Sequence, residues 1–446
     1  MAFRATYNYD SRYFAEFNAG YNGSENFSPG HRFGFFPSVA GGWLVSNEKF
    51  WTGRLADVIS LLKIKGSYGI VGNDQIGGNR RFIYLETINS GDKWSFGETV
   101  TSYPSYRRGE WANDNVGWEK SRKLDVGVDV SFFDKLRVQV DWFKEKRSGI
   151  FLQRSSIPEY VGITTKPYVN IGRMRNSGWD SSLQYDQKIG QVNFSAMGNF
   201  TFARNVIEDQ DQPDYIEKYM NRTGQARWQT FGYVSDGLFK DEVDIATSPD
   251  QSALGEVRPG DIKYKDLNND GVIDSKDVKA IGYTDVPEIV YGFGVSAQWK
   301  GFDVSVFFQG NAHVSFSINS SMVRGFTEPK MAANNVFSDI YGNYWTESNT
   351  DAKYPRLTTT EATNNNQSSD FWLVNGRYIR LKNAEFGYTF PKRLIQKMRL
   401  SQLRVFVSGT NLLTFAPFKL WDPDLQTGAS NYPNTRVANI GLNIGF

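Results

Sequence analysis

The stretch LDVGVDVSFFDKLRVQVDWF, residues 124–143, holds two runs of alternating apolar and polar residues joined by a short polar break, Asp134 and Lys135. The apolar positions recur at every second residue: Leu124, Val126, Val128, Val130 and Phe132, then Leu136, Val138, Val140 and Trp142. Successive side chains of a β-strand point to opposite faces, so each run predicts a strand with one apolar and one polar face. The short break predicts a tight turn between antiparallel neighbours.

The same alternation recurs along the whole chain, for example in VNFSAMGNFTF (192–202), YGFGVSAQW (291–299) and the terminal VANIGLNIGF (437–446). Thirteen strands are predicted in total, over residues 3–9, 12–20, 35–45, 59–70, 121–131, 136–147, 174–186, 191–203, 289–299, 302–312, 377–390, 402–412 and 436–446.

The length of these strands and the residues on their second face favour a membrane barrel. Many approach the ~9–11 residues that a tilted membrane strand needs, whereas strands of soluble sandwiches usually run ~5–6. Small or polar residues occupy the second face, as a wet or plugged lumen requires. Aromatic residues cluster beside the expected turns, as in an interfacial girdle: Tyr9, Tyr13, Phe132, Phe133, Trp299, Phe302 and Phe390. The predicted fold class is all-β, a transmembrane antiparallel β-barrel, with a soluble all-β protein as the alternative.

The connections between the strands alternate in length. Short or medium ones are expected at 10–11, 46–58, 134–135, 187–191, 300–301 and 391–400. Long ones are expected at 21–34, 71–120, 148–172, 205–288, 314–375 and 413–435. Short turns on one rim and long loops on the other are typical of outer-membrane barrels, with periplasm and exterior respectively.

This arrangement predicts the side of the membrane on which the chain ends and the need for further strands. The last strand, which ends in NIGF at Phe446, runs toward the periplasm, and its terminal aromatic resembles the recognition signal for barrel assembly. Single-chain bacterial barrels contain an even number of strands, and an open sheet edge cannot face lipid. We therefore expect further strands, from a missing N-terminal part or from a second polypeptide.

Composition excludes several classes of function. The 446 residues include 50 Lys and Arg, 48 Asp and Glu, no Cys and two His, His31 and His313. The balanced charge gives no basic field for nucleic acid, and without Cys there are no disulfides and no thiolate sites. Neither His sits in a catalytic motif, and no phosphate-binding Gly-rich loop is present. We therefore expect no enzyme; a hydrolase would depend on one of the two His.

The segment YKDLNNDGVIDSKD, residues 264–277, matches the calcium-loop pattern D-x-[DN]-x-[DN]-G. Alternate positions of such a loop supply the oxygen ligands that a hard divalent cation prefers. The predicted ligands are Asp266, Asn268, Asp270, the Val272 carbonyl, Asp274 directly or through water, and Asp277. Asp277 stands where Glu is usual, so weaker binding is expected. An Asx- and Gly-rich turn without an ion is the alternative.

The flanks of this segment predict a single structural site rather than a sensor. Pro259 and Gly260 prevent a helix before the loop, and the segment after it allows barely two turns, so the loop is dockerin-like rather than a paired EF-hand. It falls in the long connection 205–288, which the topology places outside the cell. There, abundant calcium would order the connection.

Five segments resemble the C-terminal part of SusC/RagA-type TonB-dependent transporters of Bacteroidetes. They are GFFPSVAGGW (34–43), GDIKYKDLNNDGVIDSKD (260–277), YGFGVSAQWKGFDVSVFFQG (291–310), RYIRLKNAEFGYTFP (377–391) and VFVSGTNLLTF (405–415). The resemblance implies an outer-membrane barrel of about 22 strands, the size of plugged transporters. It also implies a plug and TonB-contacting segment before the barrel, and a SusD-like surface lipoprotein as a lid over the loops. We expect both to lie outside the sequence of this chain.

Two functions from different classes remain open. The first is the barrel of an outer-membrane nutrient importer that takes up oligosaccharides or oligopeptides. The second is a calcium-stabilised, secreted, lectin-like binding protein that uses loop aromatics to hold sugars. Six Trp residues lie in or beside the expected long loops, and packing is favoured over ligand stacking for each: Trp111, Trp118, Trp228, Trp345, Trp372 and Trp421.

Overall fold

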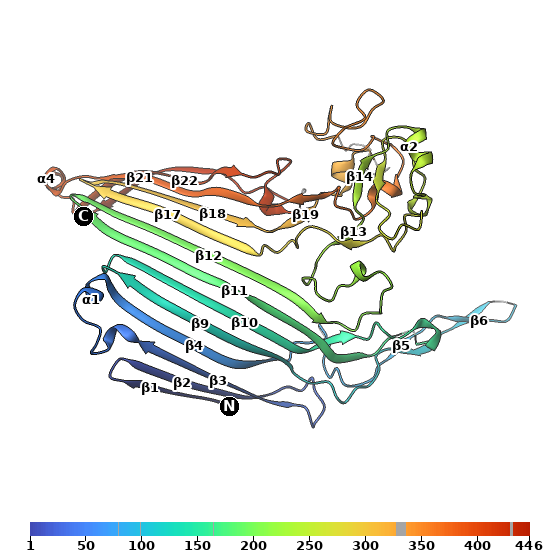
Figure 1. The fold of residues 1–446 in the computed structure, drawn as a ribbon, viewed down its shortest axis with the longest axis horizontal. Coiled ribbons are helices and arrows are strands. Elements are labelled where there is room, and N and C mark those ends of the chain that lie inside the picture. The colour runs from blue at the N-terminus through green and yellow to red at the C-terminus, as the bar shows by residue number, and fades with distance from the viewer. Residues whose placement is uncertain (79, 99, 164, 327–335, 429–430) are drawn as a thin grey trace. The chain divides into compact units, whose positions relative to one another are not determined.

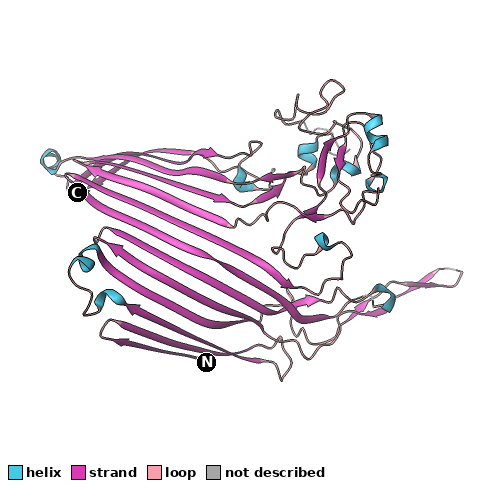
Figure 2. Cartoon of the chain, viewed as in Figure 1, coloured by secondary structure: helices cyan, strands magenta, loops and turns pink. Residues whose placement is uncertain are grey.

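A computed structural model describes residues 1–446 except 79, 99, 164, 327–335 and 429–430. The predicted loops 71–120, 148–172, 314–375 and 413–435 include these undescribed residues. The fold is all-β, and thirteen strands form one antiparallel sheet in which each strand pairs with its neighbours in the chain (Figures 1 and 2). The predicted number and order of strands are confirmed.

The strands of this sheet are β1 (Ala2–Tyr9), β2 (Tyr13–Gly23), β3 (Phe33–Leu44), β4 (Ile59–Asn73), β9 (Glu119–Phe132), β10 (Leu136–Gln153), β11 (Tyr168–Ile189), β12 (Val192–Asp209), β17 (Ile289–Trp299), β18 (Phe302–Ala312), β21 (Tyr378–Thr389), β22 (Gln402–Phe415) and β23 (Val437–Gly445).

Three strands extend further toward the long connections than predicted. β10 runs to Gln153 rather than residue 147, β11 begins at Tyr168 rather than 174, and β12 runs to Asp209 rather than 203. Their extra residues include charged and polar side chains that interrupt the apolar period. Antiparallel pairing continues through them because the backbone ladder needs only correct register, not apolar side chains.

The short turns have the backbone geometry that closes a hairpin. Lys300 and Gly301 join β17 to β18 with φ values of 49° and 90°. Positive φ at both residues is the signature of a primed turn, which matches the right-handed twist of the strands. These two residues therefore close the β17–β18 hairpin locally.

The chain forms two compact units, residues 1–181 with 203–214, and residues 182–202 with 215–446. In the second unit, strand register places four apolar residues on one face, between 44% and 85% exposed: Val304, Phe386, Val407 and Ile440. The adjacent row, on the other face, is polar: Ser305, Glu385, Ser408 and Asn439.

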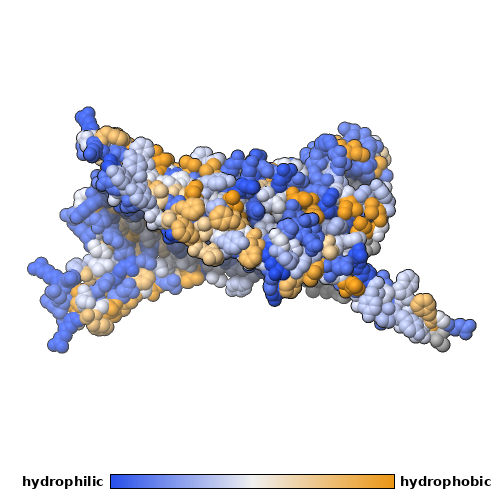
Figure 3. Space-filling model, turned by 90° about the horizontal axis from the view of Figure 1, so that it is seen from below, coloured by the Kyte–Doolittle hydropathy of each residue, from blue (hydrophilic) through white to orange (hydrophobic). Residues whose placement is uncertain are grey.

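The first unit repeats this division. An exposed apolar row crosses four strands at Phe17, Val39, Tyr68 and Leu124. The row beside it points to the other face: Glu16, Ala40, Ser67 and Asp125. Figure 3 shows such hydrophobic residues, in orange, at the molecular surface over the strands. A large exposed apolar surface is not what a water-soluble sandwich presents, and it marks contact with an apolar environment.

Aromatic rings gather beside the short turns in each unit, as predicted. In the first unit, Tyr13 stacks on Trp43 with ring centroids 6.4 Å apart. In the second, Phe302 and Tyr388 lie 4.5 Å apart, and Tyr388 contacts Phe390 at 5.0 Å.

Helices and short strands occur only in the connections of the described chain. The helices are α1 (Arg54–Val58), α2 (Glu242–Thr247), α3 (Ser321–Arg324) and α4 (Lys392–Ile395). The short strands of the first unit are β5 (Ile88–Ser90), β6 (Trp94–Phe96), β7 (Thr101–Tyr103) and β8 (Tyr106–Arg108). Among the described residues, no helix combines the length and the apolar run required to span a membrane.

The connections before β17 and after β18 fold together into what we call the loop module, the described residues of 215–288 and 313–377. Three strand pairs build it: β13 (Phe231–Gly232) with β16 (Lys279–Ala280), β14 (Ser235–Leu238) with β15 (Ile262–Tyr264), and β19 (Ser315–Ser317) with β20 (Leu373–Asn375). Its buried apolar cluster includes Ile262, Tyr264, Phe316, Ile340 and Trp372. The two connections of the loop module therefore share a hydrophobic core of their own.

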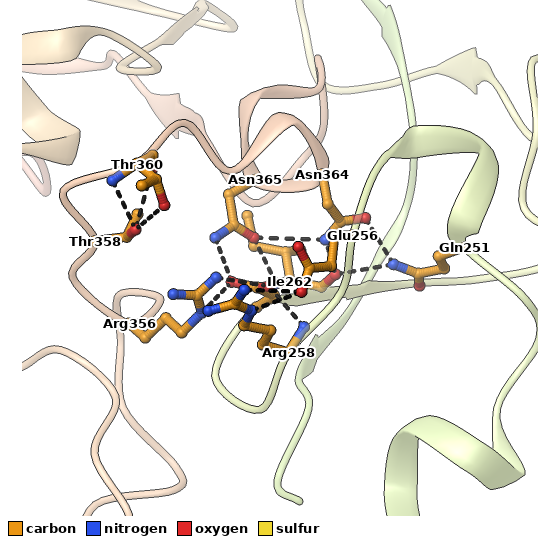
Figure 4. Close-up of polar contacts among 10 residues, drawn as sticks. Gln251, Glu256, Arg258, Ile262, Arg356, Thr358, Thr360, Asn364 and Asn365 are labelled. Carbon is orange, nitrogen blue, oxygen red and sulfur yellow. Dashed lines mark hydrogen bonds and ion pairs between the residues drawn. The ribbon is translucent and has the colours of Figure 1, made fainter. Parts of the chain in front are cut away.

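A buried charge lies within the loop module, and Figure 4 labels its partners Arg258, Arg356 and Asn365. The charge is that of Asp261, which is fully buried; its Oδ1 accepts a 2.8 Å hydrogen bond from Asn365 Nδ2 and lies 2.8 Å from Arg356 Nε. Its Oδ2 accepts from the Arg258 backbone N–H at 2.9 Å. Asn365 Oδ1 in turn accepts from the Ile262 backbone N–H at 2.8 Å. The network therefore joins the two connections that make up the module.

We predict that Asp261→Ala opens the loop module. Removing one partner of a buried ion pair leaves the other charge without compensation, at a cost of about 3–5 kcal/mol. Limited proteolysis should show faster cleavage within 215–377. The matched control is Asp236→Ala, because Asp236 forms a half-exposed pair with Lys265 at 3.5 Å and such pairs contribute about 0–1 kcal/mol. Equal protease resistance of both variants would contradict the prediction.

Candidate functional site

The segment 266–277 forms a compact loop between β15 and β16. Gly271 has φ of 84° and Asn269 has φ of 61°, both in the left-handed region that a sharp turn needs. Ile273 is fully buried in the core of the loop module. Ile273, between two of the predicted ligand positions, therefore anchors the loop to that core.

The side chains of the loop bind its own backbone. Asp266 accepts hydrogen bonds from the Asn269 N–H at 2.6 Å and from the Gly271 N–H at 2.8 Å. Asp277, fully buried, accepts from the Leu267 N–H at 2.7 Å and the Asp274 N–H at 2.9 Å. The first and last predicted ligands thus close the loop on itself.

A neighbouring segment braces the loop. The Asp250 N–H donates to the Gly271 carbonyl at 3.0 Å, and the Ile273 N–H donates to the Asp250 carbonyl at 2.8 Å. These two bonds form a short parallel bridge between Asp250 and Val272. The Val272 carbonyl takes part in neither of these two bonds.

The electrostatics of the loop are dominated by carboxylates. Burial, with the nearby Glu217 and Asp277, raises the pKa of Tyr219 to about 12. The Tyr219 hydroxyl donates to the Lys276 carbonyl at 2.8 Å. Lys276 Nζ lies 3.4 Å from Asp270 Oδ2 and 3.3 Å from Asp274 Oδ2. Those contacts raise the pKa of Lys276.

The donors suit calcium by type, because all six are oxygens on one loop. They are not drawn to one point, however: within the described ranges, no group of three or more His, Cys, Asp or Glu side chains is placed to hold a metal ion. This one loop contains all six predicted ligands: Asp266, Asn268, Asp270, Val272, Asp274 and Asp277. A cation at this site stays a prediction.

The two His residues have local structural partners. His313 Nδ1 lies 3.0 Å from Glu288 Oε2, and its ring stacks on Tyr283 at 4.6 Å. His31 Nδ1 lies 3.1 Å from Ser28 Oγ, but the Ser28 hydroxyl donates its proton to the Asp114 carbonyl at 2.7 Å. His31 therefore does not accept that proton, and this pair lacks the bond that activates a serine nucleophile.

Most of the singled-out Trp side chains are packed. Trp372 is buried, Trp345 and Trp421 pack against the loop-module core, Trp118 contacts Phe27 and Phe36, and the Trp111 indole donates to the Thr165 carbonyl at 2.6 Å. Trp228 is different, since 67% of it is exposed.

One charged cluster was missed by sequence reasoning. Arg380, on the polar face of β21, has a side chain only 2% exposed, and it bonds Asp424 Oδ2 at 2.9 Å, Thr414 Oγ1 at 3.0 Å and Asp422. Asp422 and Asp424 belong to the connection 416–436, so the cluster clamps this connection to the sheet. Arg380 lies more than forty positions before Asp422 and Asp424 in the sequence, so no local motif marks the cluster.

Comparisons with known proteins agree with the resemblance that the motifs predicted. The chain is 29% identical over 476 aligned residues to the TonB-dependent receptor P3 of Formosa agariphila. It is 26% identical over 457 residues to the TonB-dependent receptor SusC of Bacteroides thetaiotaomicron. Each alignment covers 99% of this chain but only 45% and 43% of the relatives, so the chain spans less than half of their length. No family model matches the chain.

The fold is shared with a solved structure of the RagAB peptide transporter. The TM-score is 0.74 at 22% sequence identity, over 99% of this chain and 47% of that chain. The resemblance to SusC/RagA-type TonB-dependent transporters is confirmed, and the relatives are named as receptors and transporters rather than enzymes.

We predict that Arg380→Ala releases the connection 416–436 from the sheet. The substitution leaves Asp422 and Asp424 partly buried without their cation, and breaking such a pair costs about 3–5 kcal/mol. Protease cleavage within 416–436 and a lower unfolding temperature are the expected results. Arg377→Ala is the control, because Arg377 is exposed and its side chain has no ion-pair partner in the described structure. Equal behaviour of the two variants would rule out the clamp.

Proposed function

We propose that this chain, which resembles SusC/RagA-type TonB-dependent transporters over its whole length, is the C-terminal part of an outer-membrane import barrel. The observation that carries the proposal is the two-faced sheet, whose apolar rows are exposed while its second face holds charged and polar side chains. Lipid on one side and a polar lumen on the other are the environments that such strands require. The secreted lectin-like alternative would leave these apolar rows in water.

The alternation of short and long connections supports the proposed orientation. The short turns and the C-terminus at Phe446 lie on the periplasmic side, and the loop module and the connection 416–436 lie outside the cell. Cargo then meets the long connections first and passes along the polar faces of the strands.

The proposed cargo is an oligosaccharide or an oligopeptide. A SusD-like surface lipoprotein would close over the long connections, and TonB would act through a segment outside this chain. Further strands, from the same protein or a second polypeptide, would complete the barrel. The shared fold with a transporter named for peptides supports the peptide branch, and the relationship to SusC supports a lid partner.

An uptake assay in the native host tests this function. Deleting the gene should abolish uptake of one class among labelled oligopeptides and oligosaccharides, and the intact gene should restore it. Dissipating the inner-membrane proton gradient should stop uptake while surface binding persists. A protein that is monomeric in buffer without detergent would overturn the proposal.

A lipid-facing strand predicts a strong dependence on which face carries a charge. Val407→Arg should destabilise the barrel in membranes by about 2–4 kcal/mol, because Arg at the lipid midplane is costly. Ser408→Arg, one residue along on the polar face, is the control and should fold normally. The measurement is the fraction of the full-length protein that resists SDS unfolding without heating. Equal folding of both variants would argue against lipid at Val407.

We further propose that the loop 266–277 binds calcium as a structural ion. Its oxygen donors, its left-handed turn residues and its buried Ile273 support the proposal. The Lys276 ammonium group lies beside two of the donors and offsets part of their charge. A site of extracellular strength, with Kd of ~10⁻⁴–10⁻³ M, would be filled by external calcium.

Calcium should therefore protect the connection 210–288 from protease, with about 1.4 kcal/mol of stabilisation at ten times Kd. Asp266→Ala should remove the protection. Lys276→Gln should tighten binding several-fold, because it removes a positive charge near Asp270 and Asp274. Lys279→Gln, at a lysine without an ion pair in the described structure, should leave the affinity unchanged. Identical digestion of the native protein in calcium and in chelator would exclude the site.

A further inference from the structure

A pocket of about 320 Å³ lies where the connection 416–436 meets the polar face of β21 and β22. Arg380 and Thr414, from the two strands, form its base. Phe418, Trp421 and Pro433 give it an apolar wall, and the cationic side chains of Lys419 and Arg436 also line it.

The positive charge of Arg380 at the base of the pocket is already satisfied. Arg380 faces Asp422 and Asp424, and Asp424 also accepts a bond from Asn434 Nδ2 at 3.2 Å. These contacts hold the base together, so Arg380 has a structural task and is not the group that would attract a ligand.

Lys419 and Arg436 differ from Arg380. Both are exposed, and across the described part of the chain neither has a carboxylate partner. Each extends from an anchored segment. Beside Lys419, the Phe418 ring is buried 4.7 Å from Trp421. Before Arg436, the Thr435 carbonyl accepts a bond from Asn411 Nδ2 at 3.0 Å.

We propose that this pocket binds an anionic group of the cargo, a carboxylate or a sulfate, between Lys419 and Arg436. The inference rests on the proposed import function and narrows its cargo to chains that carry acidic groups. Charge-assisted hydrogen bonds from the two cations would hold the anion. Trp421 and Phe418 would contact the adjoining sugar ring or peptide side chain, since aromatic faces suit both.

The pocket volume and position agree with this assignment. About 320 Å³ accommodates one sugar or amino-acid unit rather than a whole oligomer. The pocket lies on the polar face of the strands, at their long-connection end, where the proposed import route begins. An acidic unit held there would select cargo before passage.

The test uses the full-length protein with its lid partner and two pairs of probes. One pair is trigalacturonate and neutral galactotriose, and the other is an Asp-containing hexapeptide and its Asn counterpart. Calorimetry should show that the native protein prefers the acidic member of at least one pair by about tenfold or more, and that the preference falls with added salt. The pair that shows it identifies the source of the anion.

The double variant Lys419→Gln with Arg436→Gln should lose this preference and keep its affinity for the neutral probe. Arg377→Gln with Lys392→Gln removes the same charge elsewhere in this unit and should retain it. A native protein that does not distinguish the probes overturns the inference, and so does a double variant that keeps the preference or loses neutral binding as well. Uptake that fails in the host counts against import itself.

Discussion

The antiparallel hydrogen-bond ladder between consecutive long strands is the constraint on which the rest of the structure depends. A backbone amide covered by apolar side chains finds no water, so it must bond within the sheet. Successive side chains of a strand point to opposite faces, so a sheet with one apolar and one polar face has a sequence period of two. Val407 and Ser408 show this in two residues: Val407 is exposed on the apolar face, and Ser408 lies on the polar face.

Charge is arranged differently in the sheet and in the long connections. On the polar face of the sheet, ion pairs such as Lys65 with Asp129 and Asp141 cross from strand to strand, at 3.0 and 2.9 Å. In the loop module a charged side chain is buried: Asp261 forms an ion pair with Arg356 and accepts hydrogen bonds from amide groups. Arg380 combines both arrangements, because it lies on strand β21 and forms a buried ion pair with the connection 416–436. Connections fixed in this way present defined surfaces.

The sequence could predict the regular part of the structure well. Alternation located all thirteen strands, and turn residues such as Lys300 and Gly301 divided short connections from long ones. The calcium pattern was found because its residues are adjacent in the chain. The Asp261 network and the Arg380 clamp could not be found, since their partners are separated by about a hundred and by more than forty residues, and no local period marks them. The extra length of β10, β11 and β12 was missed because backbone pairing there continues without an apolar period.

The loop module has a consequence for how the β17–β18 hairpin is assembled. Its two halves join the same end of that hairpin, where Ile289 pairs with Ala312, and they meet in bonds such as Ser315 N–H to the Thr284 carbonyl at 3.0 Å. A register error that kept the faces correct would shift one strand by two residues, about 6.6 Å. Such a shift would separate groups that meet within hydrogen-bonding distance. Closure of the loop module therefore depends on the correct register of β17 and β18. A hairpin with shifted register would leave the two connections open to proteases.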